Sequence, residues 1–148
     1  MYSLFMFLIG LYGIGATIIW IWGIRQTCFC KNPYGLTQLL APYGIFVWGD
    51  AVMIGFFWMI VTAVSIWLQN MQLFFIVMCV FWMVRSAGEI MYWFLQQFAE
   101  TKRDKPESLW CHSLFPGESI WFAYQLFWQL VLVVSSVCLI YLVVQLLQ

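Results

Sequence analysis

The sequence predicts an all-α membrane protein, a bundle of four transmembrane helices in antiparallel up-down topology. Of its 148 residues, 65% are apolar and only 8% are charged, whereas soluble domains carry about 25% charged residues. Four apolar runs each exceed the roughly 20 residues that a bilayer-spanning helix needs. The chain also holds ten Trp and seven Tyr, which favour membrane interfaces. We therefore expect a single integral membrane domain over residues 1–148.

The first predicted span covers about residues 3–24, roughly 33 Å of helix. It is not typical of a signal peptide, because no positive region precedes it and no small-residue cleavage site follows. Small residues let a neighbouring helix approach closely. They predict a packing surface on this helix, formed by Gly10, Gly13, Ala16 and Thr17.

Residues 25–42 separate the first two spans and carry turn signals at Asn32-Pro33 and at Pro42. The short apolar run between these signals predicts a short interfacial segment between helices 1 and 2. The second span then covers about residues 43–68.

A connection at residues 69–72 is short enough to make the flanking helices antiparallel neighbours. The third span covers about residues 73–98 and the fourth about residues 120–147. The segment between them, 99–119, is the most highly charged part of the chain.

The basic residues predict an orientation for these spans. Loop 25–42 holds Arg25 and Lys31, and loop 99–119 holds Lys102, Arg103 and Lys105. Basic loops stay on the cytoplasmic side of a membrane. We therefore expect loops 25–42 and 99–119 to be cytoplasmic and both termini to lie outside.

Three ionisable residues fall within predicted spans: Asp50 in the second, and Arg85 and Glu89 in the third. Charged side chains near the centre of a spanning helix cost about 2.5–3.5 kcal/mol each on insertion scales. Counting from residue 43, Asp50 lies about 10 Å inside the membrane. Arg85 and Glu89 are four residues apart, so they share one helix face.

We expect these residues to form a buried polar cluster together with residues at similar depth. The cluster is either a structural ion pair that fixes helix register or a functional site, and the sequence leaves both interpretations open. Its predicted members are Asp50, Arg85, Glu89, Tyr92, Gln125 and Gln129.

A weak zinc pattern lies in the two basic loops, at Cys28 and Cys30 and at Cys111 and His112. Three thiolates and an imidazole suit tetrahedral zinc, but these spacings are not the usual ones. Reduced thiols are the simpler interpretation in a reducing compartment. We therefore expect no metal and no other cofactor.

The sequence holds no phosphate-binding glycine loop and no hydrolase or metalloprotease motif. Its net charge of zero excludes a basic nucleic-acid footprint. The expected partners are the lipid bilayer and either further copies of the chain or a larger membrane complex. We predict a transporter or channel for a proton, ion or small solute. The alternatives are a membrane enzyme or binding protein for a lipid-like substrate, and an accessory or assembly subunit of a membrane complex.

Overall fold

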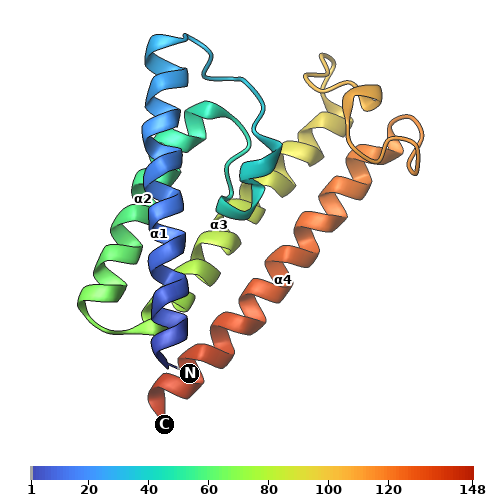
Figure 1. Cartoon of the computed structure of the whole chain (residues 1–148). Helices are drawn as coiled ribbons and strands as arrows, with labels where there is room; N and C mark the ends of the chain where they lie inside the picture. The colour runs from blue at the N-terminus through green and yellow to red at the C-terminus, as the bar shows by residue number, and fades with distance from the viewer. Residues whose placement is uncertain (1) are drawn as a thin grey trace. The chain divides into compact units, whose positions relative to one another are not determined.

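The computed structural model describes residues 2–148, apart from the side chains of Tyr2 and Gln38. Four of its helices are long and apolar enough to cross a membrane, which confirms the predicted all-α class and the four long apolar helices. The described residues hold no β-strand beyond one isolated bridge. The elements in chain order are α1 (Tyr2–Ile24), a π-helical turn η1 (Arg25–Phe29), a 3-10 turn η2 (Gln38–Tyr43), α2 (Trp48–Trp67), α3 (Met71–Phe98), a 3-10 turn η3 (Pro106–Ser108) and α4 (Ser119–Leu147) (Figure 1).

The chain divides into two compact units, Met1–Val77 and Met78–Gln148. The first holds α1, α2 and the first turns of α3. The second holds the rest of α3, the charged loop and α4. A single domain over residues 1–148 stays a prediction.

In the first unit, α1 and α2 run antiparallel and pack through small residues. A Cβ atom added at Gly13 would lie 2.5 Å from Oγ1 of Thr62, and one at Gly23 would lie 2.8 Å from Cβ of Ala51. A Cβ atom at Gly55 of α2 would meet backbone atoms of α1 at 3.1 Å. Such small residues let two helix backbones come close together. Gly13 thus forms part of a packing surface, as predicted.

The segment between α1 and α2 runs alongside α1 rather than staying at its end (Figure 1). The hydroxyl of Tyr43 donates a hydrogen bond to the carbonyl of Tyr12, near the middle of α1, at 3.3 Å. The indole of Trp58, in the middle of α2, donates to the carbonyl of Tyr43 at 3.0 Å. The predicted interfacial segment is therefore helical in part, as η2, but η2 ends beside the middle of both helices.

Two antiparallel arms form this segment, which we call the hairpin (residues 36–47). Leu36 and Val47 form its isolated bridge. The backbone N–H of Thr37 donates to the carbonyl of Phe46 at 2.9 Å. Gly44 ends η2 with a φ of 75°, a conformation that glycine adopts without steric cost. Because residues 45–47 pair in the hairpin, α2 begins at Trp48 and not near residue 43.

In the second unit, α3 and α4 run antiparallel. Rings of Trp93 and Tyr124 lie 4.6 Å apart between centroids, and those of Trp82 and Trp128 lie 6.3 Å apart and stacked. Aromatic pairs at such distances stabilise helix packing beyond the area they bury. These two contacts fix which faces of the helices meet.

Lys102 stabilises the carboxyl end of α3. Its ammonium donates to the carbonyls of Gln96 and Gln97 at 2.8 and 2.9 Å and lies 4.7 Å from the ring centre of Trp121. The last carbonyls of a helix lack partners within the helix, and a lysine there can donate hydrogen bonds to them. Its positive charge also interacts favourably with the negative end of the helix dipole. The charged loop is thereby attached to both helices of the unit.

Candidate functional site

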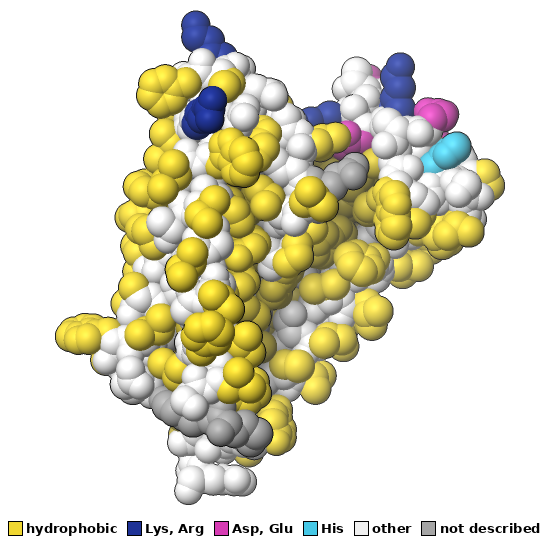
Figure 2. Space-filling model, viewed as in Figure 1, with side chains coloured by type: hydrophobic (Ala, Val, Ile, Leu, Met, Phe, Trp, Pro, Cys, Tyr) yellow, Lys and Arg dark blue, Asp and Glu magenta, His cyan; other side chains and the backbone are white. Residues whose placement is uncertain are grey.

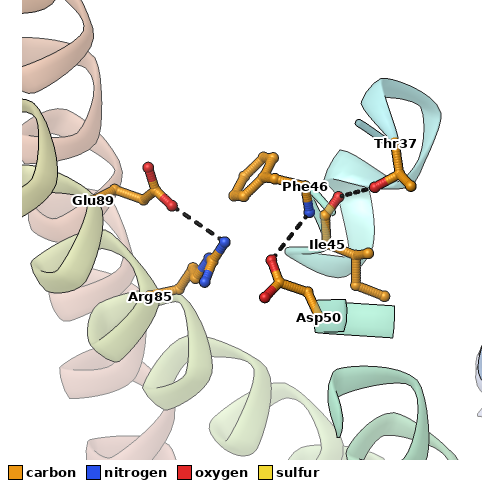
Figure 3. Close-up of polar contacts among 6 residues, drawn as sticks. All are labelled: Thr37, Ile45, Phe46, Asp50, Arg85 and Glu89. Carbon is orange, nitrogen blue, oxygen red and sulfur yellow. Dashed lines mark hydrogen bonds and ion pairs between the residues drawn. The ribbon is translucent and has the colours of Figure 1, made fainter. Parts of the chain in front are cut away.

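Arg85 and Glu89 form an ion pair near the middle of α3 (Figure 3). The distance from Nη2 of Arg85 to Oε1 of Glu89 is 3.2 Å, and their side chains are only 25% and 16% exposed. Residues four apart on a helix face the same way, so the helix itself brings the two charges together. The structure confirms this contact, which the spacing predicted.

Placing this pair in an apolar span is costly. Each charge alone costs about 2.5–3.5 kcal/mol at the centre of a spanning helix. Pairing offsets part of that cost, since a partner and hydrogen bonds compensate for lost hydration. Two apolar residues would avoid the cost entirely. The pair is therefore a candidate functional site as well as a structural one.

Two further polar atoms lie buried on α3 close to the ion pair. Among the described residues, neither Oγ of Ser86 nor Nε1 of Trp93 has a hydrogen-bond partner. Ser86 is fully buried and Trp93 is 7% exposed. They are seven residues apart, so they share one face of α3. A buried polar atom without a partner costs about 1–3 kcal/mol.

Asp50 lies in the first turn of α2, where its carboxylate accepts a hydrogen bond from the backbone N–H of Phe46 at 3.3 Å (Figure 3). The positive end of the helix dipole favours a carboxylate there. The neighbouring Ala51 packs against Gly23, near the end of α1. Asp50 therefore lies close to the end of α1, because α2 begins five residues later than predicted. Its depth in the membrane stays a prediction.

Other predicted members of the cluster have further partners, and Tyr92 also interacts electrostatically with Glu89. The hydroxyl of Tyr92 donates to the carboxylate of Asp104 in the charged loop. Gln125 accepts a hydrogen bond from the side chain of Gln97 at 2.6 Å. Gln129 is exposed on α4. That all six residues form one cluster stays a prediction.

Gln96 is a buried polar residue outside the predicted set. Its side chain is 6% exposed, and its Oε1 accepts the backbone N–H groups of Arg103 and Asp104 at 3.2 and 3.5 Å. Gln96 lies eleven residues after Arg85, and this spacing alone places it on the same polar face of the helix. The partners of Gln96 lie in a loop whose path the sequence does not encode in any short motif.

The residues of the weak zinc pattern are divided between the two units, with Cys28 and Cys30 in the first and Cys111 and His112 in the second. Within the described residues, no group of three or more His, Cys, Asp or Glu side chains lies close enough to hold a metal ion. Cys28 and Cys30 are exposed free thiols, and Cys111 is a half-buried one. His112 is exposed.

Comparison with known proteins gives no independent guide to the site. No protein-family model, no curated protein and no solved structure matches the chain.

Proposed function

We propose that the protein is a membrane transporter or channel for a proton, an ion or a small polar solute, with Glu89 as the group that binds the moving species. The observation that carries the proposal is the Arg85–Glu89 ion pair in the middle of an apolar helix. Ionisable residues inside a span usually belong to a substrate pathway or a proton relay.

The chemistry of the pair suits reversible binding. Glu89 accepts a proton or a cation at Oε1, and its contact with Arg85 then weakens because the carboxylate charge is neutralised. When the proton or cation leaves, the ion pair re-forms.

The proposal includes an orientation and an assembly. The four helices cross the membrane up and down, with loops 25–42 and 99–119 in the cytoplasm and both termini outside, as the basic residues favour. The hairpin then enters the membrane from the cytoplasmic side, because η2 ends beside the middle of α1. Non-helical backbone at that depth needs cover from protein or a water-filled cavity, which supports a homo-oligomer.

Flux measurements on purified protein in liposomes test the proposal. Vesicles with a pH-sensitive dye inside, or with a K⁺, Na⁺ or Cl⁻ gradient, should show flux above that of empty vesicles. Glu89→Gln removes the charge and keeps the size. It should lower the flux about tenfold or more, since a contact to a charged group is worth about 1.5–3 kcal/mol.

Gln145→Leu is the matched control, because Gln145 is a polar residue of a span with an exposed side chain and lies outside the predicted cluster. This variant should keep the flux of the unsubstituted protein. Absence of flux for all these ions would contradict proton or ion transport and favour an accessory subunit. Unchanged flux in Glu89→Gln would contradict the role of Glu89.

A further inference from the structure

A shallow groove runs along the outer face of α1 in the first unit. It is lined by Ile18, Ile21, Trp22 and Arg25 and has a volume of about 260 Å³. These positions are spaced three, four and seven residues apart, so they lie on one helix face. The groove is smaller than the roughly 300–1,000 Å³ of a typical drug-sized pocket.

Three of the four lining residues are large, apolar and directed away from the rest of the unit. Ile18 is 54% exposed, Ile21 58% and Trp22 52%. In a helix that crosses a membrane, such a face meets acyl chains. The shape and chemistry of the groove therefore suit one hydrocarbon chain lying along the helix.

Arg25 lines the groove with apolar atoms, and its charged group contributes almost nothing to that lining. Arg25 follows the last residue of α1, and Lys31 lies six residues further on with an exposed side chain. No acidic residue precedes Asp50 in the sequence. Figure 2 shows basic side chains gathered at this end of the helix, above a column of apolar side chains. The Trp22 ring lies 6.4 Å from that of Trp48, in keeping with the preference of Trp for the interface.

We propose that this groove binds a phospholipid with an anionic headgroup. One acyl chain lies against Ile18, Ile21 and Trp22, and the phosphate binds the guanidinium of Arg25. Arginine suits this role because its planar donors match two phosphate oxygens at once. The proposal does not depend on transport, since it uses neither Arg85 nor Glu89.

Native mass spectrometry of the full chain tests it. The protein is offered an equimolar mixture of phosphatidylglycerol and phosphatidylcholine with identical acyl chains. The unsubstituted protein should retain more phosphatidylglycerol. Arg25→Gln should reduce this preference about fivefold, the effect of one basic side chain near an anionic lipid. Arg25→Lys should keep most of it.

Two more variants separate the groove from general charge attraction. Lys105→Gln removes an exposed basic residue from the other loop and should leave the preference unchanged. Ile21→Trp fills the groove and should lower retention of both lipids, while thermal unfolding confirms that the variant is folded. Equal retention of both lipids by the unsubstituted protein, or an unchanged preference in Arg25→Gln, would overturn the proposal. Displacement of phosphatidylglycerol by inorganic phosphate would overturn it too, since the site would then bind free phosphate.

Discussion

At Gly13, α1 comes so close to α2 that any side chain there would collide. A Cβ atom would lie 2.5 Å from Oγ1 of Thr62 and 2.9 Å from its Cβ. Thr62 cannot easily turn away, because its hydroxyl donates to the carbonyls of Trp58 and Met59 at 2.8 and 2.9 Å. Gly88 of α3 is different, since nothing lies within 4 Å of an added Cβ atom.

Gly13→Ala and Gly88→Ala therefore form a matched pair of variants. Gly13→Ala should lower the free energy of unfolding by about 1–3 kcal/mol, the cost of overpacking. Gly88→Ala should leave it unchanged or raise it by up to about 1 kcal/mol through helix propensity. Thermal unfolding in detergent measures both. Equal melting temperatures for the two variants would contradict the close packing of α1 on α2.

Tyr43 attaches the hairpin to α1, by its hydroxyl bond to Tyr12 and by ring stacking at 4.3 Å between centroids. Tyr43→Phe removes only the hydroxyl. It should destabilise the protein by about 1 kcal/mol, the net value of one hydrogen bond. Tyr141→Phe is the control, because Tyr141 is exposed and its hydroxyl contacts only the exposed Gln145 in the bonds described. A smaller effect at Tyr43 than at Tyr141 would show that the hairpin is not held there.

At the scale of elements, the hairpin and the loop after α3 are held by contacts between residues distant in sequence. The loop depends on Lys102, which binds the end of α3, and on Gln96, which accepts two of the loop's N–H groups. Lys102→Met should free the loop and speed hydrogen exchange at the amides of Arg103 and Asp104. Hydrogen exchange with mass spectrometry measures this.

Lys105→Met is the control for that experiment, since Lys105 is exposed. It should leave exchange in the loop unchanged. If both variants gave the same exchange rates as the unsubstituted protein, Lys102 would not hold the loop.

The long helices could be predicted from the sequence, and the hairpin could not. Length and apolar content determine a spanning helix almost alone, so α1, α3 and α4 match the predicted spans to within about two residues. The start of α2 depends instead on Gly44 and on pairing between residues 36 and 47. The place of Asp50 in the first turn of α2 follows from that start. Arg85 and Glu89 were predictable because their contact is set by the helix repeat.

At the scale of the whole molecule, the chain has four long apolar helices, and five of its six basic residues lie in two loops. Cys28, Cys30 and Cys111 lie in these loops. If the loops are cytoplasmic, a membrane-impermeant maleimide should label none of them on intact cells and should label them after permeabilisation. Labelling on intact cells would reverse the orientation.

A second labelling experiment tests the C-terminus, which we expect on the outer side of the membrane. With Cys28, Cys30 and Cys111 replaced by Ser, Gln148→Cys places a single new thiol at the C-terminal residue. This thiol should react with the impermeant maleimide on intact cells. Protection of Gln148→Cys would place the C-terminus inside.

The central claim is that Glu89 itself, and not merely an ion pair, supports transport. Exchanging the charges, Arg85→Glu with Glu89→Arg, tests it most directly. The exchange keeps an ion pair with the acidic residue first, the more favourable order on a helix, so the protein should fold. The exchanged protein should fold, and its flux in liposomes should fall to that of Glu89→Gln. Flux equal to that of the unsubstituted protein would show that the pair is structural.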